Sequence, residues 1–263
     1  PLAYLESVSN YSVDDAGQVI LINCDNIRVE TLNLSYTTVG LELFATNNSK
    51  IMNNNITTNN WSGLYLYWSV NNSIVGNNIE ANKWTGIYVE GSSNNSVVAN
   101  NITENFDGVI FYKSSSNSII ENSVTKSRWG ISLGASFSNV MIKNNMTDNL
   151  VGAYLDGSSN SLVGNNIRAN SWEGIVLGGS NNTIVDNEIT ANGWNGIYVE
   201  GPDNNIINNN ITANSWDGVS ISESNNNVID NNITGNGWDG ILLGWHYVGL
   251  SNNSIISNNI KNN

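Results

Sequence analysis

Residues 196–217 read GIYVEGPDNNIINNNITANSWD, and residues 218–239 read GVSISESNNNVIDNNITGNGWD. Each copy opens with glycine and alternating apolar residues, and continues as apolar–x–x–Asn–x–apolar–x–x–Asn. Such short alternations are typical of strands, whereas a helix needs apolar residues three and four positions apart over a longer window. The Asn, Ser and Gly residues between them are turn formers. The two copies therefore predict short strands separated by tight turns.

The same unit repeats along most of the 263 residues. Its glycines are 23 residues apart twice and then 22 residues apart seven times, and a weaker copy begins at Gly17. The repeat glycines are Gly40, Gly63, Gly86, Gly108, Gly130, Gly152, Gly174, Gly196, Gly218 and Gly240. Three short strands per repeat, without hairpin turns, describe one coil of a parallel β-helix. We therefore expect an all-β, single-stranded parallel β-helix of about eleven coils at residues 17–263, preceded by a lead-in segment at residues 1–16.

Asparagine is unusually abundant, with 54 residues, while charged residues make up only 12%. Asn tolerates left-handed backbone at corners, and its amide can both donate and accept. Stacked copies can therefore hydrogen-bond along the rod, whereas stacked charges would repel one another. One such ladder comprises Asn54, Asn77, Asn100, Asn122, Asn144, Asn165, Asn187, Asn209 and Asn231. The Asn excess is thus predicted to be mainly architectural.

Charge and cysteine content exclude several protein classes. A net charge of −13 leaves no basic surface for nucleic acid. No apolar run approaches the roughly 20 residues of a membrane helix, so no transmembrane segment is expected. The single cysteine, Cys24, excludes an internal disulfide framework or a Cys-based zinc site, and we expect it to be a small buried residue.

The repeat has two irregularities. From the ladder Asn to the next glycine the spacing is nine residues, but it is eight before Gly108, Gly130 and Gly152. One turn is therefore shorter in these middle coils. The last coil gains about five residues at positions 244–249, which predicts a projecting loop.

The stretch Gln18–Leu34 and the later Gly-Ile-x-Val…Asn-x-Ile units resemble PbH1-type right-handed parallel β-helix repeats. The likeness is greatest to NosD-like and CASH-type repeats, which are common in archaeal cell-surface proteins. The resemblance implies a right-handed helix, but such folds host lyases, hydrolases, epimerases, adhesins and inert rods. A copper role by analogy with NosD is disfavoured, because one His, one Cys and three Met supply few soft ligands, so no cofactor is expected. The single histidine, His246, is followed by Tyr247 and does not match the Asp-Pro-His-Glu motif of alginate epimerases.

An aromatic residue stands two positions before most repeat glycines. Trp129 stands one position before its glycine, and we expect it to join the same stack. With the outward tyrosines of the following strand, these residues predict an aromatic face: Trp61, Trp84, Phe106, Trp129, Trp172, Trp194, Trp216, Trp238, Tyr65, Tyr88, Tyr154 and Tyr198. The rings could stack only on each other at a corner, form an assembly interface, or bind sugar rings.

Acidic residues precede several repeat glycines, at Asp107, Glu173, Asp217 and Asp239. Asp217 and Asp239 are expected about 5 Å apart, one strand spacing, where they could share a Ca²⁺ ion or act as a glycosidase pair. The alternative is a solvated acidic edge without catalytic residues. Pectate lyases of this fold need a basic residue beside acidic ligands, and none of the three arginines lies beside Asp217 and Asp239 in the repeat register.

Thirteen Asn-x-Ser/Thr sequons are candidates for N-glycosylation and fit a secreted glycoprotein. They are Asn10, Asn33, Asn47, Asn55, Asn60, Asn71, Asn94, Asn101, Asn145, Asn181, Asn210, Asn232 and Asn252. We expect an extracellular, cell-surface location.

These observations favour a non-enzymatic structural protein that self-associates, head to tail or laterally, into a filament, sheath or surface layer. The expectation rests on apparently uncapped end coils and on the aromatic face. The alternatives are a polysaccharide-binding module that uses the Trp ladder, and a polysaccharide lyase or glycoside hydrolase centred on Asp217 and Asp239.

Overall fold

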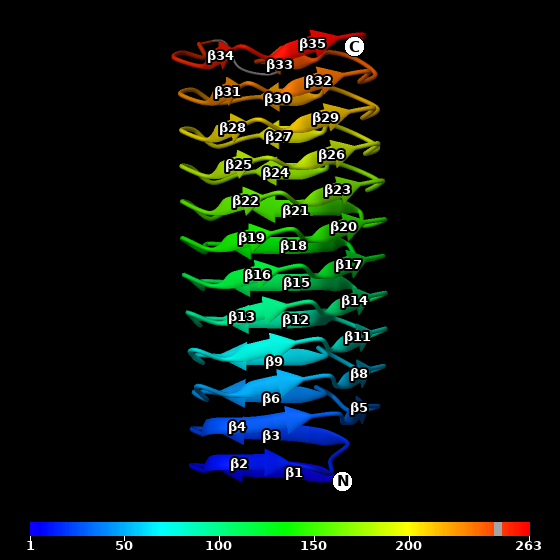
Figure 1. Cartoon of the computed structure of the whole chain (residues 1–263), viewed down its shortest axis with the longest axis vertical. Coiled ribbons are helices and arrows are strands. Elements are labelled where there is room, and N and C mark those ends of the chain that lie inside the picture. The colour runs from blue at the N-terminus through cyan, green and yellow to red at the C-terminus, as the bar shows by residue number, and fades with distance from the viewer. Residues whose placement is uncertain (245–248) are drawn as a thin grey trace.

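The computed structural model describes residues 1–244 and 249–263, and it forms an all-β rod of stacked coils (Figure 1). Each coil after the first contributes one strand to each of three parallel sheets, and the first coil contributes to two of them. The predicted right-handed parallel β-helix is confirmed. No helix of a length and apolarity sufficient to span a membrane is found among the described residues.

The first sheet has twelve strands. They are β1 (Leu2–Glu6), β3 (Gln18–Ile22), β6 (Leu41–Phe44), β9 (Leu64–Tyr67), β12 (Thr85–Glu90), β15 (Asp107–Tyr112), β18 (Trp129–Gly134), β21 (Val151–Leu155), β24 (Ile175–Leu177), β27 (Ile197–Val199), β30 (Val219–Ile221) and β33 (Ile241–Leu243).

The second sheet also has twelve strands. They are β2 (Ser9–Val13), β4 (Asp25–Glu30), β7 (Lys50–Met52), β10 (Ser73–Val75), β13 (Ser96–Val98), β16 (Ser118–Ile120), β19 (Val140–Ile142), β22 (Ser161–Val163), β25 (Thr183–Val185), β28 (Asn205–Ile207), β31 (Asn227–Ile229) and β34 (Ser254–Ile256).

The third sheet has eleven strands. They are β5 (Asn33–Ser35), β8 (Asn55–Thr57), β11 (Asn78–Glu80), β14 (Asn101–Thr103), β17 (Ser123–Thr125), β20 (Asn145–Thr147), β23 (Asn166–Arg168), β26 (Glu188–Thr190), β29 (Asn210–Thr212), β32 (Asn232–Thr234) and β35 (Asn259–Lys261).

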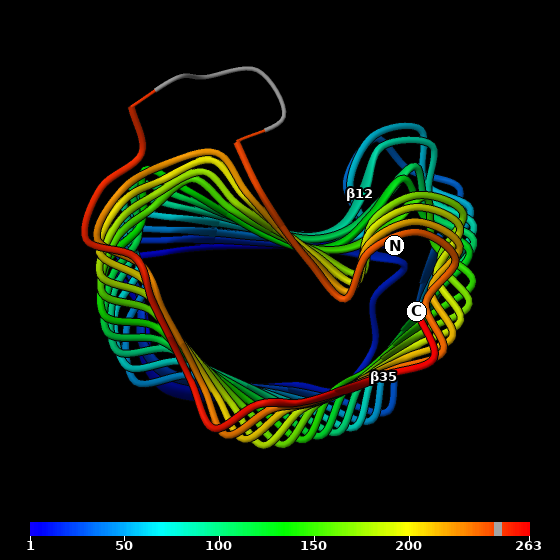
Figure 2. The same cartoon turned by 90° about the horizontal axis from the view of Figure 1, so that it is seen from above.

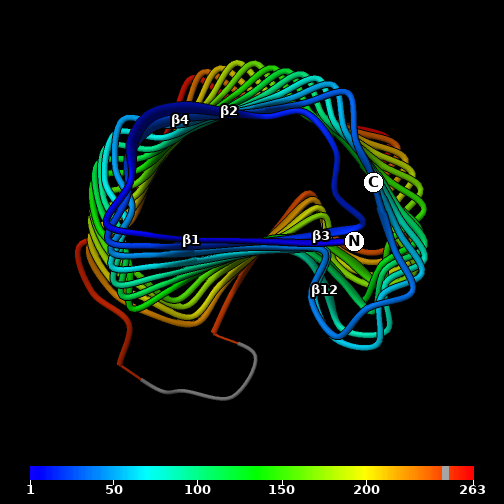
Figure 3. The same ribbon diagram turned by 90° about the horizontal axis from the view of Figure 1, so that it is seen from below.

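The segment 1–16 differs from the lead-in that the repeat spacing predicts. Its strands β1 and β2 pair in parallel with β3 and β4, and they lie at the lower end of the rod (Figure 3). Two strands of a coil therefore form here without the glycine signature, because the alternation of side chains is sufficient for parallel pairing.

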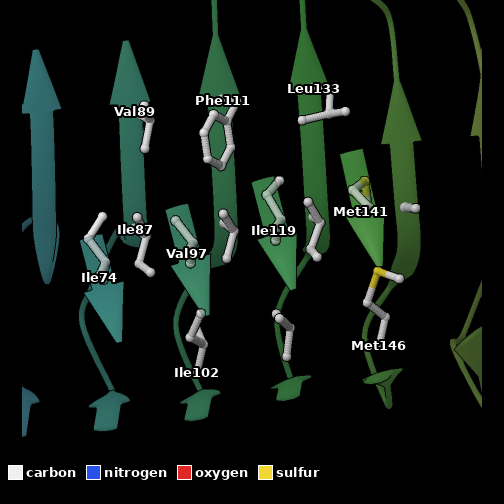
Figure 4. Close-up of a cluster of buried hydrophobic side chains, with 14 of the residues drawn as sticks. Ile74, Ile87, Val89, Val97, Ile102, Phe111, Ile119, Leu133, Met141 and Met146 are labelled. Atoms are coloured by element: carbon white, nitrogen blue, oxygen red, sulfur yellow. The ribbon is translucent and has the colours of Figure 1, made fainter. Parts of the chain in front are cut away.

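Apolar side chains of successive coils stack in rows inside the rod (Figure 4). The pairing places Ile74 beside Val97, Val97 beside Ile119, and Ile119 beside Met141. All four side chains are fully buried, as is Met146 in the third sheet. Because strands repeat at equal positions, β-branched and similar apolar side chains fill the interior without gaps.

The buried Asn ladder from Asn54 to Asn231 is confirmed, and a parallel ladder runs from Asn72 to Asn226. A third row, from Asn59 to Asn236, is interrupted at Ser127, whose backbone N–H donates to Asn149 Oδ1 at 3.0 Å. Asn122 shows the shared geometry. Its Oδ1 accepts from the backbone N–H of Asn100 at 3.0 Å and from the Asn100 amide at 2.9 Å. Its own Nδ2 donates to the Val97 carbonyl at 2.9 Å. Each Asn thus satisfies corner backbone groups that would otherwise be buried without partners.

Seen along the rod, the chain of successive coils bends inward at one corner (Figure 2). Each repeat glycine stands where a strand of the first sheet begins, either just before it, as Gly63 does before β9, or within its first residues, as Gly86 does in β12. A Cβ atom at Gly196 would lie 2.6 Å from the Gly218 carbonyl oxygen and 2.6 Å from Ile211 Cγ2 of the third sheet. Only glycine allows this approach of one coil's backbone to the next coil. The connection from the third sheet to this bend carries the aromatic ladder, and we call it the aromatic corner.

Candidate functional site

The aromatic corner forms a continuous stack in the later coils. The rings of Trp172, Trp194, Trp216 and Trp238 have successive centroids 4.9, 4.9 and 4.8 Å apart, with planes within 10° of each other. Each inner ring therefore has both faces covered by its neighbours. Sugar rings bind aromatic faces, so the inner tryptophans of this stack offer no face to a glycan, and their packing contributes to stability.

The stack is interrupted in the middle coils. Trp84 stacks on Phe106 at 5.4 Å, and the guanidinium of Arg128 then takes the next position, 4.5 Å from the Phe106 ring centroid. The expectation that Trp129 joins this stack is wrong. Trp129 begins β18, pairs with Val151, and places its ring 4.9 Å from that of Tyr154. The ladder position lies two residues before the glycine in the shortened turns as well, and there the chain has Arg128.

A pocket of about 390 Å³ lies at this interruption, on the outward face of β12, β15, β18 and β21. Ser132 lies at the floor of this pocket. In the strand register it is paired with Ile110 on one side and with Tyr154 on the other. The small serine between larger side chains leaves the hollow. The pocket is lined by Trp84, Thr85, Tyr88, Asp107, Ile110, Tyr112, Arg128, Trp129, Ser132, Gly134 and Tyr154.

An ion pair closes one side of the pocket. Arg128 donates from Nε to Asp107 Oδ1 at 2.8 Å and from Nη2 to Asp107 Oδ2 at 2.9 Å. The Asp107 side chain is 4% exposed and that of Arg128 is 42% exposed. The bidentate contact satisfies the buried carboxylate and holds the plane of the guanidinium in one orientation. The sequence did not predict this ion pair. The one signal in this region was the shortened turns before Gly108 and Gly130.

The tyrosines beside the pocket keep their protons at neutral pH. Burial raises the pKa of Tyr88, with a smaller contribution from the charge of Glu90. Burial likewise raises the pKa of Tyr154, and the charge of Asp156 adds to the effect. Their hydroxyl groups are therefore available as neutral hydrogen-bond donors. Tyr65, one coil earlier, donates to Glu90 Oε2 at 3.2 Å, while Tyr198 lies half-buried on β27.

Asp217 and Asp239 lie in adjacent coils, but in different environments. Asp217 is 1% exposed, and its Oδ1 accepts from the backbone N–H of Asp239 at 3.0 Å. Its Oδ2 has no hydrogen-bond partner among the residues described. Asp239 is exposed, whereas Glu173 is buried. A solvated acidic edge therefore describes Asp239 but not Asp217 or Glu173, and Asp217 is too deeply buried to contact a substrate in this conformation.

In the part of the chain that is described, no group of three His, Cys, Asp or Glu residues could hold a metal ion.

Replacing Asp217 with asparagine is expected to stabilise the protein at neutral pH. Burial raises the pKa of Asp217, the Asp239 N–H opposes this, and the charge of Asp239 adds to it. A raised pKa in the folded state means that this carboxyl costs stability as the pH rises above its ordinary value of 3.8. Asparagine removes the charge and can still accept from the Asp239 N–H.

Thermal unfolding at pH 7 and pH 4 tests this expectation. The Asp217→Asn variant should have the higher melting temperature at pH 7, and its advantage should shrink at pH 4. Asp239→Asn, which removes an exposed carboxylate from the next coil, is the matched control. An advantage for Asp217→Asn that grows at low pH would contradict the assignment.

None of the thirteen sequon asparagines belongs to a buried ladder. Most are exposed, and Asn47, Asn145, Asn210 and Asn232 are half-buried. Their glycosylation remains a prediction. Of the expected loop at 244–249, residues 245–248, which include His246, lie outside the described residues.

Comparison with known proteins gives one family and several solved structures. The sequence model described as "Periplasmic copper-binding protein (NosD)" matches residues 5–151 and again residues 107–263. A comparison with curated protein sequences gives no match. Among solved structures, the A-module of the Azotobacter vinelandii mannuronan C-5 epimerase AlgE6 aligns with a TM-score of 0.74 and 15% identity, covering 99% of this chain and 90% of that one.

Two further structures share the fold. The periplasmic alginate epimerase AlgG aligns with a TM-score of 0.57 and 15% identity, covering 92% of this chain and 76% of that one. DFA-IIIase from Arthrobacter chlorophenolicus A6 aligns with a TM-score of 0.63 and 16% identity, covering 74% of this chain and 60% of that one. At these identities the likeness shows the fold alone.

The expected non-enzymatic filament, sheath or surface-layer protein is nevertheless corrected by these comparisons. The three solved structures compared above, two epimerases and DFA-IIIase, share this coil architecture and are enzymes rather than structural rods. A regular repeat is compatible with either role, because it defines the scaffold and leaves the outer side chains free to vary. The interruption of the aromatic stack by a pocket is the feature that the filament interpretation did not anticipate.

Proposed function

The chain belongs to the NosD family, and we propose that within this family it is an exported carbohydrate-active enzyme that binds a polysaccharide on the outward face of the first sheet. The pocket between β12 and β21 would be its principal sugar-binding subsite. The fold likeness to epimerases and to DFA-IIIase supports the choice of carbohydrate over other ligands.

The observation that carries the proposal is the combination of aromatic rings with fixed polar donors in one pocket. Trp84 and Trp129 border it, and neither ring belongs to the four-tryptophan stack. Sugar rings have apolar C–H faces and many hydroxyl groups, so they are held by aromatic side chains together with directed hydrogen bonds. Arg128 and the tyrosine hydroxyls supply those donors.

The tyrosine hydroxyls that line the pocket belong to Tyr88, Tyr112 and Tyr154. Asp107 is the one carboxylate that lines it, and both of its oxygens are engaged by Arg128. We therefore assign Asp107 a positioning role and the tyrosines the role of hydrogen-bond donors to bound sugar.

The family description names copper, but the described residues do not fit a copper site. Cys24 is buried, and its Sγ lies within hydrogen-bond distance of the Leu5 and Ile22 carbonyl oxygens. Met141 and Met146 are packed inside the core with no exposed surface. These three sulfur atoms are thus buried within the fold, and Met52 on β7 is the one half-buried soft ligand among the described residues. We assign no step of the proposed chemistry to a metal.

We place the protein outside the cytoplasm, in the periplasm or at the cell surface. Two comparisons support this location: the NosD family is described as periplasmic, and the alginate epimerase AlgG is a periplasmic protein. Exposed sequon asparagines are also compatible with an exported protein.

The Trp129→Ala variant is expected to lose polysaccharide affinity by about tenfold or more, because an aromatic anchor in a pocket carries a large share of binding energy. Calorimetric titration with a panel of neutral and acidic polysaccharides measures this loss. Trp194→Ala is the matched control: it removes the same side chain from the stack, where both ring faces are covered, and should leave affinity unchanged.

Equal losses in the two variants would contradict a localised subsite, and failure of every polysaccharide to bind would overturn the proposed function. Enzymatic action is checked by proton NMR of the bound polymer during prolonged incubation. New sugar signals are expected with the parent protein, and an unchanged spectrum would leave binding without catalysis, contrary to the proposal.

A further inference from the structure

We propose that Arg128 is the anion-binding residue of the pocket and that the polysaccharide is acidic, presenting a sugar carboxylate to the outer edge of the guanidinium. The inference rests on the proposed function, because it specifies the substrate class of the same site. It follows from the hydrogen-bond geometry of one side chain, from the neighbouring coils, and from the distribution of charge.

The guanidinium has two edges that can bind a carboxylate. Asp107 occupies the edge formed by Nε and Nη2, with bonds of 2.8 and 2.9 Å. The second edge, formed by Nη1 and the remaining N–H of Nη2, has no protein acceptor among the residues that the structure describes. Phe106 covers one face of the group, and the side chain remains 42% exposed. The planar fork is therefore held in place with its outer edge unoccupied, which is the arrangement that matches a carboxylate.

The ion pair is not a requirement of the coil. Arg128 stands two residues before its repeat glycine, and Asp107 stands one residue before its own. In the preceding coil these two positions are occupied by neutral side chains, Trp84 and Thr85. In the following coil they are held by Leu150 and Val151. Strand pairing continues through all of these coils. Buried carboxylates also precede the glycine at Glu173 and Asp217, but Asp107 is the one of these three that is paired with an arginine. The coil therefore does not require the arginine, and its presence here supports a role in binding.

The segment that supplies most of the pocket carries almost no net charge, and the carboxylates beside the pocket are Glu90, next to Tyr88, and Asp156, next to Tyr154. Residues 83–143 contain five Lys or Arg and four Asp or Glu, whereas residues 144–263 contain two Lys or Arg and eleven Asp or Glu. At moderate ionic strength, exposed charges more than about 10 Å apart are largely screened from each other. The charges close to the pocket therefore matter more for an anion than the net charge of −13.

The remaining polar groups of the pocket favour a ligand that accepts hydrogen bonds. The hydroxyls of Tyr88 and Tyr154 stay protonated, since burial raises the pKa of both. The single carboxylate of the lining is already neutralised by Arg128. A sugar carboxylate could accept from Arg128 and from these hydroxyls, whereas a neutral sugar would leave the outer edge of Arg128 without an ionic partner.

The test compares two polymers with the same backbone, polygalacturonate and its fully methyl-esterified form, in calorimetric titrations against the whole protein. We expect the parent protein to bind the acid form about 10- to 100-fold more tightly, the range of a charge-assisted bidentate contact. Raising the sodium chloride concentration from about 0.05 to about 0.5 M should reduce this preference, since salt screens the ionic contact. Arg128→Gln should abolish the preference, because the affinity for the acid form falls to the level of the ester.

Arg128→Gln leaves Asp107 buried without its partner and could unfold the coil. The double variant Asp107→Asn/Arg128→Gln removes both charges, keeps the net charge of the parent, and should fold and show the same loss of preference. Arg168→Gln, which removes an exposed arginine of β23 in the third sheet, is the control and should retain the preference. Equal binding of acid and ester by the parent protein overturns the inference and leaves the proposed function standing. Binding of neither polymer overturns the inference, and it overturns the proposed function as well if every other polysaccharide of the panel also fails to bind.

Discussion

Replacing Asn122 with alanine should lower the free energy of unfolding by about 3–5 kcal/mol. The substitution removes the acceptor of the Asn100 backbone N–H and of the Asn100 amide, and the donor to the Val97 carbonyl. All of these groups are buried between coils, where water cannot replace the lost partner. A buried donor or acceptor left unsatisfied costs about 1–3 kcal/mol, and here at least two are left.

Urea denaturation followed by circular dichroism measures the change. The matched control is Asn101→Ala, which removes an exposed asparagine of the third sheet whose amide donates to Asn78 Oδ1 at 2.8 Å. We expect less than about 1 kcal/mol there, because water can satisfy the exposed groups. Similar losses in the two variants would mean that the buried ladder adds nothing beyond surface hydrogen bonding.

The Gly108→Ala variant should lose about 3 kcal/mol of stability and also weaken polysaccharide binding. A Cβ atom at this position would lie 2.4 Å from the Gly130 carbonyl oxygen and 2.4 Å from Val124 Cγ1. The first contact is with backbone, which cannot rotate away, so the coils must separate. Asp107 precedes this glycine, and its movement would also displace Arg128.

The same denaturation experiment, combined with titration of the bound polysaccharide, tests this expectation. Gly178→Ala is the control, because its added Cβ would meet its nearest neighbour, Asp156 Oδ1, at an ordinary contact distance of 3.4 Å. We expect an effect below about 1 kcal/mol and unchanged binding for the control. An Ala variant at Gly108 that is as stable as the control would show that the bend toward the axis is not sterically required.

Several interpretations from the sequence failed for a common reason. Counting back from the glycine identified which residues share a ladder, but it carried no information on the tilt of the rings. The face-to-face packing of Trp194 with its neighbours, which removes it from sugar binding, depends on rotamers set by the corner backbone. The repeat register correctly placed no arginine beside Asp217 and Asp239, but the pairing of Arg128 with Asp107 was not predicted.

The period of 22 or 23 residues by itself determined the parallel β-helix, the buried apolar rows and the Asn ladders. Each of these repeats in every coil, so alternation and spacing are enough to define it. The tertiary structure alone decided that the aromatic stack breaks at Arg128, that Ser132 leaves a hollow between larger side chains, and that one guanidinium edge remains open. These features depend on contacts between coils at a single place in the rod, and a periodic pattern describes what the coils share rather than where one of them differs.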